Sequence, residues 1–157
     1  MKMGIVVHSQ TGHTLLIAEK IRDALKEKKA DVTLHHLSVE RDKKTPTDIV
    51  FDDLPDISGY DTLVFGSSVE AFTLSPVMKK YLAIDLPMQN KRVHLFVTQH
   101  LPSPMLGGNR AIRRMKSDCN KKGAAIGETA VINWSGKARD RQIAACVQKL
   151  SNACVEK

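Results

Sequence analysis

Two hydrophobic periods alternate along this chain. Short apolar runs bounded by turn residues have the length of buried strands, and between them apolar residues recur every three or four positions, as on the buried face of a helix. The short runs predict strands over residues 3–8, 32–37, 62–66, 93–97 and 124–134. The wider spacing predicts helices over residues 12–28, 76–82 and 109–121, and a C-terminal helix with Ile143, Val147, Leu150 and Cys154 on one face.

Five strands separated by helical crossovers predict a three-layer α/β fold, in which helices cover both faces of a five-stranded parallel sheet. We expect a single domain over residues 1–157, since no repeat or linker interrupts the pattern. Residues 38–60 are irregular and polar, with Pro46 and Pro55, and predict a loop with a short helix or an extended piece over residues 48–57. In such sheets, ligands bind beyond the carboxyl ends of the strands, where the strand order reverses.

Composition and charge narrow the range of partners. The formal net charge of +7 suits acidic proteins, anionic substrates or nicotinamide phosphates. We expect no nucleic-acid partner, because only 4% of the residues are aromatic and no recognition motif is present. We also expect no membrane insertion and no signal peptide, since the apolar runs are short and the chain opens on a strand pattern. Cys119, Cys146 and Cys154 lack the spacing of metal ligands or of a redox pair, which predicts reduced thiols in a cytoplasmic protein.

The first strand ends in a hydroxyl-rich turn, SQTGHT, at residues 9–14. The first N–H groups of the following helix have no partner inside it, and the helix dipole favours negative charge there. Ser9, Thr11 and Thr14 add hydroxyl donors, and Gly12 lets the backbone approach a ligand closely. The turn has no Lys or Arg, so it favours a phosphate monoester over a nucleoside triphosphate, which would call for the Gly-Lys-Ser/Thr of a P-loop. The alternative is that these side chains only cap the helix.

The SQTGHT turn resembles the phosphate loop of the flavodoxins, a Ser/Thr-x-Thr-Gly-x-Thr pattern that holds the 5′-phosphate of FMN in that family. The segment YDTLVFGSSVEAFTLSPVMKKYL, residues 60–82, is similar to the same family, including its quinone reductases of flavodoxin type. The resemblance covers nearly the whole chain and implies a flavodoxin-like sheet with the strand order 2-1-3-4-5. It also implies that the loops after the first, third and fourth strands meet around FMN.

The resemblance therefore implies FMN contacts from three loops. They are Ser9, Gln10, Thr11, Gly12, His13 and Thr14 in the first loop, Ser67, Ser68, Val69, Glu70, Ala71 and Phe72 in the second, and Thr98, Gln99, His100 and Gly107 in the third, which covers residues 98–108.

The chain departs from the family pattern where the flavin ring would lie. Ser68 replaces the usual Pro, and Glu70 and Ala71 stand where an aromatic residue or a glycine often covers the ring. Phe72 is the candidate for a stacking face, displaced by a residue or two. We expect Glu70 to point to water. If its carboxylate instead faced the ring, it would lower the flavin potential, because it disfavours additional electrons there.

Several polar residues near these loops have two interpretations. His13 flanks the expected phosphate or faces solvent, and His100 is a proton donor or a solvated surface group. The basic helix over residues 109–121 is a solvated face or the contact for a nicotinamide phosphate or an acidic protein. His35 and His36 follow one another in a strand, so their rings should point to opposite faces, which argues against a two-histidine metal site.

The resemblance implies an FMN-binding redox protein. Such a protein either transfers electrons with a redox partner protein or uses NAD(P)H to reduce a quinone-like acceptor, a small molecule, often within an oligomer. The alternative is a flavodoxin-shaped binding module with weak or no FMN binding. A phosphoacceptor receiver domain is set aside, because the strand ends carry His8-Ser9 and Gly66-Ser67 in place of clustered acidic residues.

Overall fold

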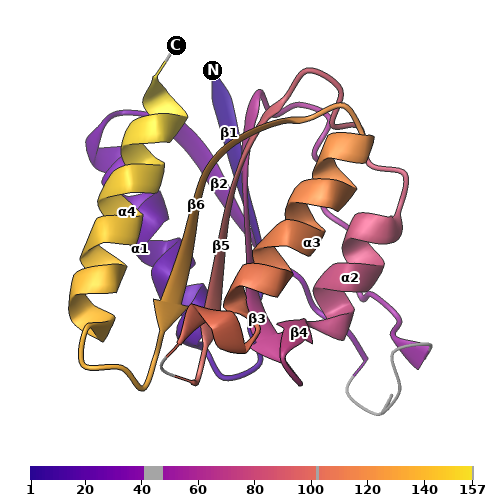
Figure 1. The fold of residues 1–157 in the computed structure, drawn as a ribbon. Coiled ribbons are helices and arrows are strands. Elements are labelled where there is room, and N and C mark those ends of the chain that lie inside the picture. Colours follow the sequence, from indigo (N-terminus) through magenta and orange to yellow (C-terminus); the bar gives the residue numbers. More distant parts are fainter. Residues whose placement is uncertain (41–47, 102, 157) are drawn as a thin grey trace.

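Five parallel strands form the sheet that the hydrophobic pattern predicts (Figure 1). The structure, a computed structural model, describes residues 1–40, 48–101 and 103–156. The parallel strands are β1 (Lys2–His8), β2 (Asp31–His36), β3 (Thr62–Glu70), β5 (Arg92–Gln99) and β6 (Ala125–Asn133). They lie in the order β2-β1-β3-β5-β6, which is the expected order 2-1-3-4-5 when only parallel strands are counted. The one addition is a short strand, β4 (Thr73–Leu74), that pairs antiparallel with β3.

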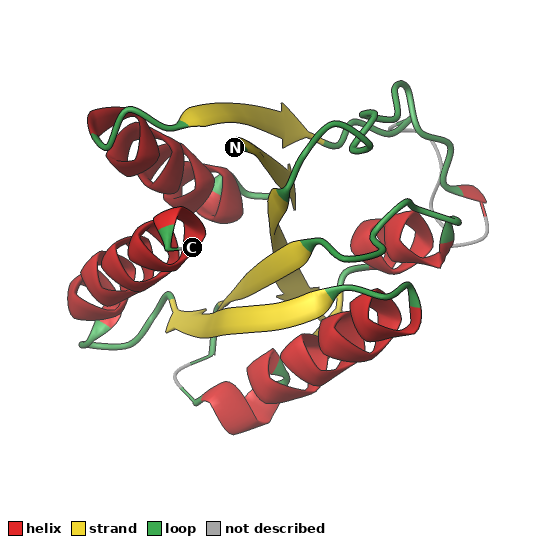
Figure 2. Ribbon diagram, turned by 90° about the horizontal axis from the view of Figure 1, so that it is seen from above, coloured by secondary structure: helices red, strands yellow, loops and turns green. Residues whose placement is uncertain are grey.

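Helices cover both faces of the sheet, as expected (Figure 2). One face carries α1 (His13–Glu27) and α4 (Arg139–Val155), and the other carries α2 (Pro76–Ala83) and α3 (Gly108–Lys121). A short 3-10 helix, η2 (Pro104–Leu106), precedes α3. None of the helices in the described ranges combines the length and the apolar character needed to cross a bilayer.

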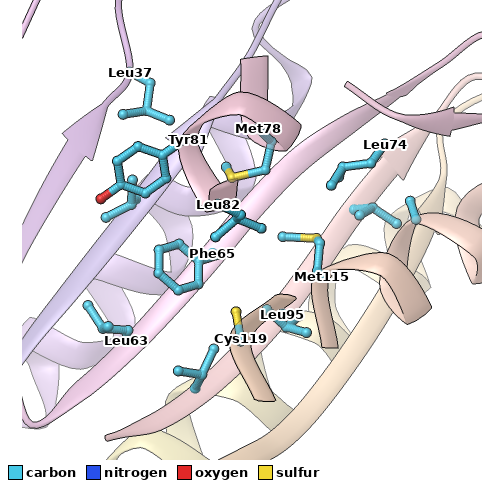
Figure 3. Close-up of a cluster of buried hydrophobic side chains, with 14 of the residues drawn as sticks. Leu37, Leu63, Phe65, Leu74, Met78, Tyr81, Leu82, Leu95, Met115 and Cys119 are labelled. Carbon is cyan, nitrogen blue, oxygen red and sulfur yellow. The ribbon is translucent and has the colours of Figure 1, made fainter. Parts of the chain in front are cut away.

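Each face of the sheet has its own hydrophobic core, because successive side chains of a strand point to opposite faces. Val64 joins the core under α1 and α4, whereas the adjacent Phe65 joins the core under α2 and α3. In this second core, Phe65, Tyr81 and Met115 pack together between the sheet and the helices (Figure 3).

All three cysteines lie in these cores. Cys119 belongs to the α2 and α3 side, and Cys146 and Cys154 belong to the α1 and α4 side. Burial raises the pKa of each thiol to about 12, so all three are neutral thiols near pH 7. Their helical spacing therefore reflects core packing.

The segment after β2 is irregular where the structure describes it, apart from one isolated bridge. Val39 and Phe51 form an isolated antiparallel bridge, and Ile49 and Ile57 are buried. Pro46 and the rest of residues 41–47 lie outside the described residues. The expected helix of the 76–82 segment begins as predicted, since the Ser75 side chain accepts a hydrogen bond from the Met78 N–H at 3.2 Å, with Pro76 in the first turn.

Two strands are longer than their apolar runs predict. The run over residues 62–66 ends at Gly66, but β3 continues to Glu70 and β5 continues to Gln99. Backbone pairing explains the difference, because Ser68 aligns with Thr98 in the parallel ladder. Polar side chains hide this extension from a hydrophobic pattern. Residues 67–70 and 98–99, which we expected in loops, therefore lie in strands.

Gly66→Ala is expected to lower the free energy of unfolding by about 1–3 kcal/mol, because the core has no room for a methyl group there. A Cβ on Gly66 would lie 2.2 Å from Cζ of Phe96, whose ring is fully buried. Gly59→Ala is the matched control, since a Cβ at Gly59 meets nothing within 4 Å. Urea denaturation measures both variants, and equal stabilities would contradict the close packing at Gly66.

Candidate ligand site at the carboxyl edge of the sheet

The SQTGHT turn joins β1 to α1 at the carboxyl edge of the sheet. Gly12 has a φ of 91°, a left-handed conformation that glycine adopts without steric cost. Its N–H donates to Ser9 Oγ at 3.0 Å, and the Ser9 N–H donates to His36 Nε2 at 3.3 Å. No side chain caps the start of α1, and Gln10 and Thr11 are exposed. The first N–H groups of α1 therefore remain available to an anion.

Thr14 links this turn to the middle of the sheet. Its side chain is buried, and its Oγ1 lies 2.8 Å from Oγ1 of Thr98 at the end of β5. Thr98 in turn aligns with Ser68 of β3. The first and third expected loops are thus in direct contact through two hydroxyl groups. If Thr98 donates to Thr14, the Thr14 proton is left for a ligand.

Buried polar atoms without a partner are concentrated at this edge. Six buried side-chain nitrogen or oxygen atoms among the described residues have no hydrogen-bond partner. Four of them belong to the last residues of β1, β3 and β5: His8 Nδ1, Ser68 Oγ, Glu70 Oε2 and Gln99 Oε1. Because buried polar groups are nearly always hydrogen-bonded, this concentration indicates a site for a polar ligand.

The second expected loop is a tight hairpin. Val69 pairs with Leu74 and Glu70 pairs with Thr73, so only Ala71 and Phe72 form the turn. Both turn residues have positive φ, 49° and 63°, as in the type I′ turns of two-residue hairpins. The side chain of Phe72 is 57% exposed. The expected stacking residue thus lies at the tip of a hairpin, where solvent reaches it.

The third loop closes against this hairpin. Gly107 has a φ of 123°, and a Cβ there would lie 2.8 Å from Val69 Cγ1 and 2.9 Å from the Phe72 backbone. Between the two segments remains a slot of about 160 Å³. It is lined by Val69, Ala71, Phe72, Gln99, His100, Leu101 and Leu106. Pockets that enclose a drug-sized ligand usually measure about 300–1,000 Å³, so this slot can hold only part of such a ligand as it stands.

Gln99 fixes the shape of the third loop. Its Nε2, which carries two N–H donors, lies within hydrogen-bond distance of three acceptors: the Leu101 carbonyl at 3.1 Å, Asn133 Oδ1 at 2.6 Å and the Ser103 carbonyl. Gln99 is one of the expected FMN contacts, and of its side-chain amide only the acceptor Oε1 is without a partner. His100 is exposed beside it, and its carbonyl accepts a hydrogen bond from the Ser135 N–H at 3.2 Å.

The expectation that Glu70 points to water is wrong for one of its oxygens. The side chain is half-buried, and Oε2 is shielded from solvent without a partner. Burial raises the pKa of this carboxyl group, which favours its neutral form. The physical reason is the hairpin: pairing with Thr73 fixes Glu70 in a strand, and the pleat then decides where its side chain points.

His8, the last residue of β1, has a strongly lowered pKa. Burial, with a smaller contribution from His36, lowers the pKa of His8 to about 4. His35 and His36 lie on opposite faces as predicted, since His35 Nε2 lies 2.6 Å from the Tyr60 hydroxyl whereas His36 faces Ser9.

Trp134 is a neighbour of the turn that the sequence analysis did not single out. The His13 ring stacks on Trp134 with 3.8 Å between ring centres and 9° between planes. The Arg139 guanidinium lies 5.3 Å from the centre of the Trp134 ring. Burial, then Arg139 and His100, lower the pKa of His13. A usable signal was the position of Trp134 directly after the last strand, because the carboxyl ends of parallel strands share one edge.

The chain has the flavodoxin fold. No family model and no curated protein matches its sequence. Among solved structures, flavodoxin 1 of Bacillus cereus has a TM-score of 0.73 at 16% identity, over 99% of this chain and 97% of that one. The Fusobacterium nucleatum flavodoxin bound to flavin mononucleotide has a TM-score of 0.67 at 14% identity, over 96% and 97%. The Trp repressor binding protein of Bacillus subtilis has a TM-score of 0.68 at 14% identity, over 94% and 99%.

His8→Asn is expected to reduce the amount by which the free energy of unfolding falls in mild acid. The pKa of His8 is lower in the folded protein than the ordinary 6.5, so the unfolded chain binds more protons between pH 6.5 and about 4. Stability therefore falls as the pH drops through this window. The variant should lose about 1 kcal/mol less than the wild type between about pH 7 and about pH 5. Urea denaturation at both pH values measures this difference, and equal losses would contradict the buried, neutral His8.

Proposed function

We propose that this protein binds FMN at the carboxyl edge of its sheet and moves electrons through the flavin. The observation that carries the proposal is the SQTGHT turn at the start of α1, together with the four unpartnered polar atoms at the ends of β1, β3 and β5. The flavodoxin fold supports it, since one structural neighbour is a flavodoxin bound to flavin mononucleotide.

The turn fits a phosphate monoester. Ser9 and Thr11 offer hydroxyl groups beside the first N–H groups of α1, and Thr14 adds a hydroxyl that Thr98 orients from behind. The turn itself contains no Lys or Arg. Arg139 lies near it, because its guanidinium group packs over Trp134, and Trp134 stacks on His13 of the turn. Hydrogen bonds to a charged acceptor are worth about 1.5–3 kcal/mol each, so neutral donors suffice to hold the phosphate.

The ring would lie between the hairpin and the third loop. Ser68 Oγ and Gln99 Oε1 are polar atoms that such a ligand can satisfy, and Phe72 and His100 stand at the open end of the slot. Because the slot is small, either the third loop shifts outward or the ring stays partly exposed. An exposed ring edge suits hydride or electron exchange with a second molecule, and the bound flavin supplies that redox chemistry.

Electrons would then pass to or from a redox partner protein, or from NAD(P)H to a quinone-like acceptor. The positive net charge supports NADPH or an acidic protein as the donor, because opposite charge increases the rate of encounter. His100 lies at the slot, in position to orient an acceptor.

A second candidate is a flavodoxin-shaped binding module with weak or no FMN binding. The small volume of the slot favours it, because about 160 Å³ can enclose only part of FMN. Glu70 also favours it, because it stands where a residue that covers the ring is expected. An absorbance spectrum of the purified protein and an FMN titration separate the two candidates. Tight binding of one FMN per protein molecule, followed by NADPH consumption with a quinone, supports the redox protein. No binding at tens of micromolar FMN supports the binding module.

Thr11→Ala and Thr14→Ala are each expected to weaken FMN binding by about 1.5–3 kcal/mol, because each removes a donor to a desolvated phosphate. Thr14→Ser is the matched control, since it keeps the hydroxyl beside Thr98. Titration of the apo protein, followed by flavin fluorescence and by the emission of the single tryptophan, Trp134, measures the affinity. Unchanged affinity in both alanine variants would show that the turn does not hold the phosphate.

A further inference from the structure

The net positive charge of this chain comes entirely from its last third. Residues 1–106 contain thirteen basic and thirteen acidic residues, so their net charge is zero. Residues 107–157 contain eleven basic and four acidic residues, which is the entire net charge of +7. This last third forms α3, β6 and α4, which are neighbours in space (Figure 1). The excess charge is therefore a feature of one side of the molecule.

The strand β6 lies in the middle of this side and ends the sheet. In the order β2-β1-β3-β5-β6, it pairs only with β5, so one of its two edges is open. Helices α3 and α4 flank it from the two faces of the sheet (Figure 1). An open edge carries backbone N–H and C=O groups that can pair with a further strand.

The hydrogen bonds of β6 identify which backbone groups point to the open edge. The Trp134 N–H donates to the Gln99 carbonyl of β5, so the preceding Asn133 N–H points outward, and it donates to Gln142 Oε1 of α4 at 2.8 Å. The Thr129 carbonyl also points outward, where Lys149 Nζ lies 2.5 Å away. By alternation, the N–H and C=O of Val131 point outward between these two. No described side chain is hydrogen-bonded to either group.

A groove of about 470 Å³ lies over this stretch of β6. Its lining includes Thr129 and Val131 of the strand, Arg113 and Lys116 of α3, and Lys149 of α4. All three cationic side chains are exposed, and no carboxylate is among the lining residues. The groove thus combines an open strand edge with positive charge from both flanking helices.

We propose that this groove binds an acidic, extended segment of a partner protein, which adds to β6 as a further strand. The backbone of Val131 would supply hydrogen bonds along the edge, and Arg113, Lys116 and Lys149 would select acidic side chains on the added strand. Lys149 would exchange the Thr129 carbonyl for an acidic side chain of the segment. The proposal does not depend on FMN.

Two other occupants fit the groove less well. A second copy of this chain would bring two surfaces of the same positive sign together, which is repulsive. A single-stranded nucleic acid would match the charge, but the lining offers no aromatic side chain on which bases stack. Only a peptide strand uses both the charge and the open backbone edge.

A fluorescein-labelled peptide of about ten alternating Glu and Thr residues tests the proposal by fluorescence anisotropy, with a Lys and Thr peptide of the same length as the control. We expect the acidic peptide to bind at least about tenfold more tightly than the basic one. Arg113→Glu combined with Lys116→Glu should weaken binding of the acidic peptide by about tenfold or more. Lys26→Glu combined with Lys28→Glu, the same change in net charge at the C-terminal end of α1, should change the affinity for the acidic peptide less than about twofold.

Val131→Pro tests the strand addition itself, because it removes an outward N–H and leaves the ladder to β5 intact. It should weaken binding of the acidic peptide by about fivefold, whereas Val131→Thr, which keeps the N–H, should leave this binding unchanged. Equal binding of both peptides, or acidic peptide binding unchanged by Val131→Pro in a protein with native circular dichroism, would overturn the proposal. So would tighter binding of oligothymidylate than of the acidic peptide, or a dimer in sedimentation that Val131→Pro dissociates.

Discussion

The register between β1, β3 and β5 is the constraint on which the candidate site depends. It aligns His8 with Ser67 and Ser68 with Thr98, so that three segments far apart in the sequence end at one edge. Parallel pairing gives this result without any contact between the loops themselves, because all strands present the same end to the same side. The hydroxyl pair of Thr14 and Thr98 then fixes the start of α1 to this edge. A shift of one residue in the ladder would turn every one of these side chains to the opposite face.

The hairpin at Ala71 and Phe72 is the least favourable part of this arrangement. Side chains with a Cβ adopt positive φ at a cost of roughly 1–2 kcal/mol per residue, and two such residues follow one another here. The pairing of Val69 with Leu74 and the close backbone contact at Gly107 hold them in place. Strain of this kind is concentrated at functional sites, where surrounding structure maintains it. In this protein the hairpin forms one side of the slot beside Gln99, and its pairing places a carboxylate oxygen of Glu70 out of contact with water.

Much of this molecule follows from its sequence. Apolar runs and helical spacing predict all five parallel strands and the four longer helices. The anion site at the start of α1 stays a prediction from the turn at residues 9–14. Polar strand ends do not follow from the pattern: Ser67 is buried in β3 because its hydroxyl group donates to Ser75 Oγ at 3.1 Å. The stack of His13 on Trp134 joins residues more than a hundred positions apart, and no local spacing encodes such a contact. The direction of Glu70 was unpredictable for the same reason, since strand pairing overrides a side chain's preference for solvent.

The net charge is distributed unevenly between the proposed ligand site and the basic side of the molecule formed by residues 107–157. The SQTGHT turn and the hairpin lie in the part of the chain with no net charge, and the turn itself contains no Lys or Arg. Affinity for a phosphate there must come from short-range hydrogen bonds, which salt screens weakly because they are partly withdrawn from water. The +7 of residues 107–157 acts over longer distances, and its effect on an approaching anion or acidic protein falls steeply with ionic strength. Arg139 connects the two, because it belongs to the basic part and yet lies against Trp134, which covers His13 at the turn. The proposed FMN site and the proposed acidic partner would therefore depend on different residues of this chain.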